Sequence, residues 1–171
     1  LAIALANRVE PDDTLSNLSD EDLFRRLFFQ RKGASSALLR SGEVLSLVYS
    51  FNISSNEFNN ELNVLATIGD TKRRDLYRDQ SELLRRDLVQ KRGEWRAVLP
   101  HALANYLAKR ALQNIPHEEI NTELFKSENI RLFVSCARRI EYLHDSESAR
   151  LLALTWLRHG GPLHNLEHCS D

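Results

Sequence analysis

The stretch Leu88-Val-Gln-Lys-Arg-Gly-Glu-Trp-Arg-Ala-Val-Leu99 decides the fold of this chain. Two short runs rich in β-branched and aromatic residues flank Gly93-Glu94, which is the pattern of a β-hairpin with a two-residue turn. We therefore expect one strand on each side of the turn. Since a short hairpin needs a packed face to hold together, we also expect Trp95 to be buried against the preceding helices, near Leu84 or Leu88.

Helical patterns lie on both sides of the hairpin. Upstream, apolar residues at helical spacing predict a short helix over 34–40 and longer helices over 41–51, 54–66 and 71–87. Downstream, Pro100 suits the start of a helix that ends before Pro116. Its apolar stripe consists of Leu103, Ala104, Leu107, Ala108, Ala111 and Leu112.

Further helices are predicted towards both ends of the chain. One runs over 19–30, after a capping-box-like start. Two more, over 127–140 and 146–156, form an antiparallel pair joined by a short polar turn. We expect the buried stripes of this pair to consist of Ile130, Phe133, Ala137 and Ile140 in the first helix and of Ala149, Leu152, Ala153 and Trp156 in the second.

The composition agrees with a mostly helical chain. Six glycines and four prolines among 171 residues are too few for a turn-rich β-sandwich or barrel. With 23 basic and 24 acidic side chains the formal charge is -1, so bulk charge indicates neither nucleic acid nor a membrane. Two cysteines and no leader-like start favour a cytoplasmic location. The chain has no methionine and opens on Leu1 within an apolar run, so we expect a piece of a longer protein.

The chain contains neither Gly-x-x-x-x-Gly-Lys-Ser/Thr nor Gly-x-Gly-x-x-Gly, the glycine-rich loops that cradle phosphates. We therefore expect no enzymatic activity and no cofactor from this chain alone. His164-Asn-Leu-Glu-His168 matches the H-x-x-E-H pattern of inverted zinc peptidases. Three residues follow it, too few to supply a downstream third ligand, so we expect no catalytic residue and no metal site.

Basic residues gather on the helix over 71–87 and on the hairpin. A helix-turn-helix with a hairpin wing would present such a helix to the DNA major groove. Asp75, Asp79 and Glu82 are interleaved at helical spacing, where they would neutralise much of that face. DNA is therefore kept as an alternative partner, and its candidate contacts are Arg73, Arg74, Arg78, Arg85 and Lys91.

His101 opens the helix that follows the hairpin. With the three helices before it and the hairpin, Val98-Leu-Pro-His-Ala-Leu-Ala-Asn105 resembles the winged-helix domain of STAND-class signalling ATPases. The family includes plant resistance proteins and apoptotic protease-activating factors, and the resemblance covers about residues 38–115. It implies that His101 contacts the β-phosphate of ADP held by the ATPase core of a larger parent protein. The family usually has an aspartate after this histidine, where this chain has Ala102.

The resemblance implies a division of the chain into three regions. Residues 1–40 would be a helical bundle segment, 41–116 a winged-helix domain with its small β-hairpin, and 117–171 a C-terminal helical pair at the start of a helical sensor. The implied function is that of a non-catalytic regulatory region, which holds the ADP state of a nucleotide-switched ATPase and transmits sensor input to oligomerisation. Its partners would be the core and sensor of the parent, with further copies on activation, and ADP or ATP would be a cofactor of the parent only.

Two other functions stay open. A winged helix with a basic helix is typical of DNA-binding transcription regulators. Alternatively, the hairpin and the basic helix pack against neighbouring proteins, and the chain is an interaction scaffold.

Overall fold

The computed structural model describes residues 36–54, 60–158 and 161. The chain divides into two units after Leu39, and nearly all the described residues belong to the second unit, Arg40–Asp171. The helix expected over 19–30 and the motif His164–His168 lie outside the described residues. The described elements are α3 (Ser36–Ser46), β1 (Phe51–Asn52), α4 (Glu61–Ile68), α5 (Arg73–Arg85), β2 (Val89–Arg92), β3 (Trp95–Val98), α6 (His101–Asn114), α7 (His117–Leu124), the 3-10 turn η2 (Ser127–Asn129), α8 (Ile130–Glu141) and α9 (Glu147–Leu157).

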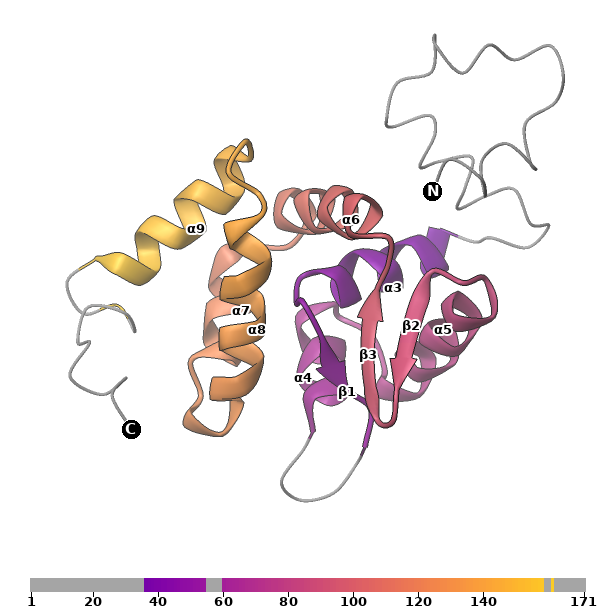
Figure 1. Cartoon of the computed structure of the whole chain (residues 1–171). Helices are drawn as coiled ribbons and strands as arrows, with labels where there is room; N and C mark the ends of the chain where they lie inside the picture. Colours follow the sequence, from indigo (N-terminus) through magenta and orange to yellow (C-terminus); the bar gives the residue numbers. More distant parts are fainter. Residues whose placement is uncertain (1–35, 55–59, 159–160, 162–171) are drawn as a thin grey trace, which may run out of the picture. The chain divides into compact units, whose positions relative to one another are not determined.

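The segment from α3 to β3 has the topology of a winged helix. Its described strands form an antiparallel sheet in the order β1-β3-β2, with β3 in the middle (Figure 1). The strand β1 lies between two helices in the sequence and pairs with the second arm of the hairpin. Because α4 packs against β1 and α5 against β2, these two helices cover one face of the sheet. The predicted fold class, mostly α with a small hairpin, is confirmed.

The hairpin forms where the sequence predicts it. Val89 pairs with Val98, and Arg92 pairs with Trp95 beside the turn. Gly93, the first central residue of the turn, has a φ of +57°, while Glu94 keeps a negative φ. A type II′ turn requires this combination and favours glycine at that position. The same turn matches the right-handed twist of the two strands.

The region before α4 differs from the prediction. One continuous helix, α3, replaces the expected short helix and the first half of its successor, and Gly42 lies inside it. The expected helix over 41–51 is wrong after Ser46, because Phe51 and Asn52 leave the helix and pair with Arg96 and Trp95 of β3. Phe51 is fully buried in this strand. A helix or a strand could bury Phe51. The strand also pairs its backbone with the edge of β3 that β2 leaves unpaired.

α5 lies within the predicted range 71–87, but the predicted start of the helix before it is wrong. Ser54 and Asn60 are not helical, and α4 begins at Glu61 with Asn60 as its N-cap. α4 ends at Ile68, and the N–H of its C-cap, Gly69, donates to the carbonyl of Leu65. Every residue of the predicted stripe on α6 is buried. Towards the C-terminal end, Ser146 caps α9 by accepting a hydrogen bond from the N–H of Ala149 at 3.3 Å.

The trailing helices follow Pro116, and the buried face of α8 differs from the prediction. Of the predicted stripe, Phe133 is buried as expected, but Ile130 is 61% exposed, and Ala137 and Ile140 are half-buried. The buried face also contains Leu132, Cys136 and Arg139, which the prediction did not include. The buried face of α8 is thus rotated about the helix axis relative to the predicted face, which would contain Ile130 and Ile140. In α9 the prediction is confirmed for Ala149, Leu152 and Trp156, which are buried. The ring of Trp156 packs edge-on against Phe133 with a centroid distance of 4.9 Å.

α8 is tied to the loop that leads from α3 into β1. The backbone N–H of Tyr49 donates to the carbonyl of Ser135 at 2.9 Å. The N–H of Ser50 donates to the hydroxyl of Ser135 at 2.9 Å, and that hydroxyl donates to the carbonyl of Ser50 at 2.7 Å. Backbone groups of the winged helix are therefore satisfied by a residue that lies 85 positions further along the chain.

Candidate anion-binding site

His101 begins α6, as the sequence predicts. The residue before it, Pro100, is the N-cap and supplies no side-chain acceptor. The first helical hydrogen bond joins the N–H of Ala104 to the carbonyl of Pro100 at 3.0 Å. The N–H groups of His101, Ala102 and Leu103 therefore have no acceptor within the helix. The exposed imidazole of His101 thus stands at the positive end of the α6 dipole.

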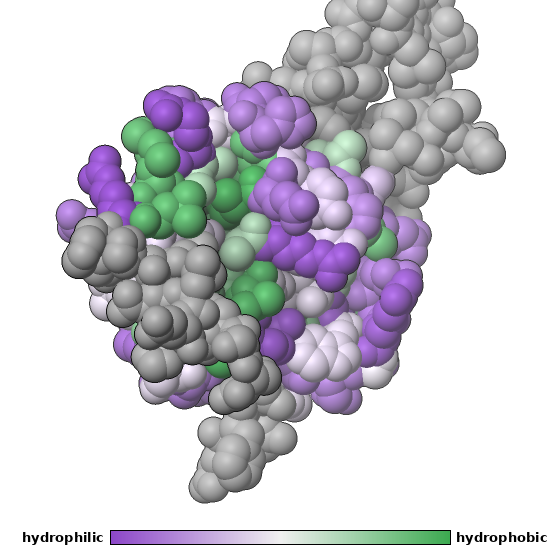
Figure 2. Space-filling model, turned by 60° about the vertical axis from the view of Figure 1, so that its left-hand side comes forward, coloured by the Kyte–Doolittle hydropathy of each residue, from purple (hydrophilic) through white to green (hydrophobic). Residues whose placement is uncertain are grey.

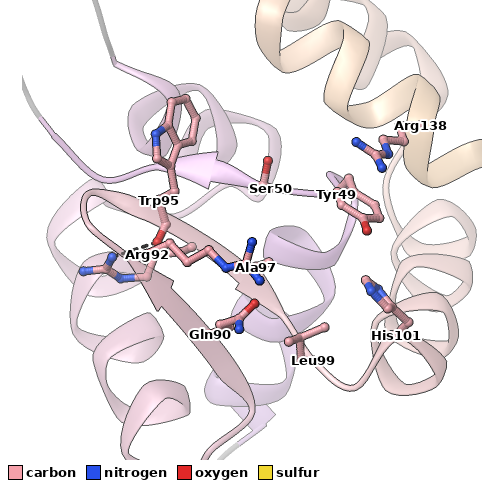
Figure 3. Close-up of a pocket in the computed structure, with 10 residues that line it drawn as sticks. Tyr49, Ser50, Gln90, Arg92, Trp95, Ala97, Leu99, His101 and Arg138 are labelled. Atoms are coloured by element: carbon pink, nitrogen blue, oxygen red, sulfur yellow. Dashed lines mark hydrogen bonds between the residues drawn. The ribbon is translucent and has the colours of Figure 1, made fainter.

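A pocket of about 310 Å³ opens beside His101. Its walls come from the loop after α3, the hairpin, the start of α6 and the last turn of α8 (Figure 3). The register pairs Gln90 with Ala97 and Arg92 with Trp95, so these four side chains share one face of the sheet. That face is the one turned towards the pocket. The lining residues are Tyr49, Ser50, Gln90, Arg92, Trp95, Arg96, Ala97, Leu99, His101 and Arg138.

Tyr49 connects the pocket residues of α6 and α8. Its ring stacks on the imidazole of His101 with a centroid distance of 5.3 Å and an interplanar angle of 23°. The guanidinium carbon of Arg138 lies 4.1 Å from the centroid of the same ring. Figure 3 shows Tyr49 between these two side chains. A cation over an aromatic face is attracted by the ring quadrupole, so Tyr49 holds Arg138 at the edge of the pocket.

Arg139 lies behind Tyr49, fully buried. Its Nη1 donates to the side-chain carbonyl of Asn105 at 2.7 Å, one turn along α6 from His101. Among the described residues, its Nε and Nη2 atoms have no hydrogen-bond partner. Burial lowers the pKa of the Arg139 guanidinium, because the charged form loses its hydration. A buried guanidinium that no carboxylate balances within the described chain thus lies beside the ring of Tyr49.

The pocket lining carries positive charge without acidic residues. Among its described lining residues none is Asp or Glu, while Arg92, His101 and Arg138 can each carry a positive charge. Arg96 also lines the pocket, but its Nη1 donates to the carbonyls of Gly93 and Trp95. Guanidinium and imidazolium groups are the side chains that bind carboxylates and phosphates. The composition of the lining therefore makes this pocket a candidate anion site.

The predicted burial of Trp95 is wrong. Its side chain is 39% exposed and lies on the pocket face of the sheet, away from α5. The guanidinium carbon of Arg131, on α8, lies 4.6 Å from the ring centroid. Arg131 in turn forms an ion pair with Glu61. The alternation along β3 buries Arg96 and Val98 on the opposite face, so Trp95 packs towards α8 and not towards the preceding helices.

The residues proposed for DNA contact are spread over α5 and the hairpin, away from the pocket. Arg78 pairs with Asp75 at 3.2 Å, and Arg85 pairs with Glu82 at 2.8 Å. Arg73 is half-buried, with a long hydrogen bond of 3.4 Å to the carbonyl of Ile53. Arg74 and Lys91 are exposed, and no acidic partner meets either of them in the part of the chain that the structure describes.

Four residues of the site were not singled out from the sequence: Tyr49, Arg92, Arg138 and Arg139. Tyr49 lies in a loop that was expected to be helical. The adjacent arginines near the end of α8 are typical of cations at a helix C-terminus, where the dipole favours them. One signal was available in the sequence: Arg139 lies three residues after Cys136, on the more apolar side of the helix.

Among the described residues, no group of three or more His, Cys, Asp or Glu side chains could hold a metal ion. No described helix has the length and apolar character that crossing a membrane requires. No family model, no curated protein and no solved structure matches the chain. The geometry of the pocket and the winged-helix topology are thus the grounds for assigning a function.

Proposed function

We propose that this chain is the winged-helix regulatory region of a nucleotide-switched signalling ATPase, with His101 contacting the phosphate of ADP in the parent protein. The observation that carries the proposal is the position of His101. It stands at the N-terminus of α6, at the mouth of a pocket with basic lining residues and no described acidic one. The helix-strand-helix-helix-hairpin order supports the same assignment.

The proposed mechanism is a shift between two conformations. In the closed state the nucleotide on the ATPase core is contacted by His101, and ADP stabilises that state by the free energy of this contact. A signal that moves the trailing helices withdraws His101 and permits assembly. The stacking of Tyr49 on His101 and the position of Arg138 over Tyr49 support such coupling, because they connect α8 to the phosphate contact.

The proposal is tested in the parent protein by measuring ADP release. His101→Ala removes one charge-assisted hydrogen bond, so we expect ADP to leave about tenfold faster and basal assembly to rise. His117→Ala is the matched control, because His117 also follows a proline at the first position of a helix but does not line the pocket. Equal ADP release from the parent and from the His101→Ala variant would contradict the proposal.

A second candidate function, a protein-interaction scaffold, is supported by a different observation. Leu151, Leu154 and Leu157 are exposed on α9, and Ile130 and Val134 are exposed on α8. Figure 2, with the side of the molecule that carries α9 turned forward, shows hydrophobic side chains among hydrophilic ones. Exposed apolar side chains that gather on adjacent helices often mark a surface covered by another protein segment.

Hydrogen exchange separates the two candidates. If α9 is covered in the parent, its amides will exchange more slowly there than in this chain, whatever nucleotide is present. Equal exchange of α9 in both proteins would contradict the scaffold function and leave the nucleotide function untouched.

A further inference from the structure

Three arginines are buried among the described residues, and they differ in how their charge is compensated. The guanidinium of Arg86 pairs with Glu82 at 2.8 Å. That of Arg96 donates to two backbone carbonyls of the hairpin. Arg139 is fully buried, and its Nη1 donates to the neutral side chain of Asn105 at 2.7 Å. Its Nε and Nη2 have no partner within the described chain, so two of its three nitrogen atoms lack the hydrogen bonds that water would supply.

α8 contacts the winged helix through a polar face, which recurs at helical spacing and consists of Arg131, Ser135, Arg138 and Arg139. The apolar side of α8 packs elsewhere, because Phe133 meets Trp156 of α9. Moving the polar face away from the winged helix would hydrate polar groups, whereas separating α8 from α9 would expose apolar ones. The contact with the winged helix is therefore the one that α8 loses more readily.

The residues of this polar face have opposite effects on the contact. Ser135 favours it, because its hydroxyl and its carbonyl hydrogen-bond to the backbone of the loop before β1. Arg139 opposes it, because a buried guanidinium without a carboxylate loses its hydration. The ring of Tyr49, 5.4 Å from the guanidinium carbon, recovers part of that loss. Burial nevertheless lowers the pKa of Arg139, so the charged form is disfavoured at this position.

We propose that Arg139 makes the contact between α8 and the winged helix reversible. In the docked position, which the structure shows, the guanidinium is buried without a carboxylate. In the second position α8 has moved away from the loop of Tyr49 and Ser50, and the guanidinium is in water. The charge of Arg139 and the hydrogen bonds of Ser135 act in opposite directions, so both positions are populated. This inference goes beyond the proposed function, because it concerns the movement of α8 whatever the pocket binds.

The amides of Tyr49 and Ser50 report this movement, because both donate to Ser135 of α8. The test measures their hydrogen exchange by NMR in this chain, without nucleotide. We expect both amides to exchange faster than that of Leu107, which is buried inside α6, since α8 moves without global unfolding. Arg139→Met replaces the buried charge with a flexible apolar side chain, so exchange at both amides should slow about tenfold.

A second variant supplies the missing counterion and leaves the arginine in place. Asn105→Asp keeps the shape of the side chain and puts a carboxylate oxygen where Nη1 of Arg139 already donates. Exchange at Tyr49 and Ser50 should slow in this variant as well. Arg138→Met is the matched control, because it makes the same change of charge at the adjacent position of α8. Arg138 is exposed and already hydrated, so its loss should not slow the exchange.

Four outcomes would overturn the inference. Unchanged or faster exchange in folded Arg139→Met would mean that Arg139 holds α8 in place, and unchanged exchange in Asn105→Asp would mean that its charge needs no counterion. Equal slowing by Arg139→Met and Arg138→Met would be an effect of net charge. Equal rates at Tyr49, Ser50 and Leu107 in the wild type would show that α8 does not move separately. None of these measurements involves nucleotide, so they are independent of ADP release from the His101→Ala parent.

Discussion

Cys136 and Arg139 lie one turn apart on the buried face of α8, and burial disfavours the charged form of each side chain. It raises the pKa of the Cys136 thiol to about 12 and lowers the pKa of the Arg139 guanidinium. In both cases the cause is the loss of hydration by the charged form. The positive charge of Arg139 opposes the shift of the Cys136 pKa but is the smaller effect. The thiol is thus a core group, while the guanidinium lies beside the ring of Tyr49.

We expect Cys136 to resist alkylation in the folded chain. The thiolate is the reactive form, and at about pH 8 a thiol with a pKa of about 12 is almost wholly protonated. In a Cys169→Ser variant, iodoacetamide should label the protein only after urea unfolds it. Rapid labelling without denaturant would show that the α8 face opens readily.

The raised pKa of Cys136 also predicts a pH dependence of stability. An unfolded thiol loses its proton near pH 8.5, whereas the folded thiol keeps it to about 12. The contribution of the neutral thiol is therefore complete below about pH 8.5 and is lost as the pH rises towards 12. Thermal melting of wild type and Cys136→Ala should converge across this window, and parallel curves would contradict the assignment.

At the scale of elements, β3 is shared by the core and by the pocket. Its Val98 faces the core, whereas Trp95 and Ala97 face the pocket. β3 also has partners on both sides, β1 and β2, and its last residue is followed closely by α6. The strand that closes the sheet therefore also sets the position of His101.

Trp95 and Phe51, which come from paired strands, should differ widely in their contribution to stability. Phe51→Ala leaves a cavity at a fully buried position and should lower the free energy of unfolding by about 3–5 kcal/mol. Trp95→Ala removes an exposed cation-π contact with Arg131 and should cost about 1 kcal/mol. Urea unfolding measures both, and similar losses would show that Trp95 is part of the core.

Sequence-specific DNA binding by α5 should be absent. Arg78 and Arg85 already pair with acids of their own helix, so few phosphates can be neutralised at once. We expect weak binding to any duplex, lost as salt is raised. A selection from random duplexes that returned one enriched sequence, with binding lost in Arg78→Ala, would instead favour the transcription regulator.

The elements that could be predicted from the sequence are those whose conformation is determined by residues within the same segment. Gly93 specifies its turn, and the stripe of α6 repeats over its whole length. β1 and the buried face of α8 depend on partners far away in the chain. The local pattern favoured a helix at β1 and a face with Ile130 and Ile140 in α8. The same holds for the pocket: His101 was found through a short motif, but Tyr49 and Arg138 join it only in the folded chain.

At the scale of the whole second unit, an ion pair joins α8 to the winged helix. Glu61 at the start of α4 is 7% exposed. It accepts hydrogen bonds from the N–H of Asn52 at 2.7 Å and from the guanidinium of Arg131. Arg131 also donates to the carbonyl of Ser50 at 2.9 Å. One carboxylate thus links β1, α4 and α8.

Glu61→Gln should destabilise the unit by about 1–3 kcal/mol, because the amide keeps the shape but leaves Arg131 without its counterion. Urea unfolding measures the loss. Glu147→Gln, at an exposed pair with Arg150 on α9, is the control and should produce no measurable change. Equal effects of the two substitutions would contradict the role of Glu61.

The hydrogen bonds of Ser135 affect how far this protein could be shortened. A chain cut at Pro116 would keep all of the winged-helix elements. It would lose the acceptors of the N–H groups of Tyr49 and Ser50 and the two side chains, Ser135 and Arg131, that donate to the carbonyl of Ser50. Two backbone donors and one acceptor at half-buried positions would then depend on water. We therefore expect a chain that extends through α8 to be more stable than one that ends at Pro116, because α8 supplies these hydrogen-bond partners.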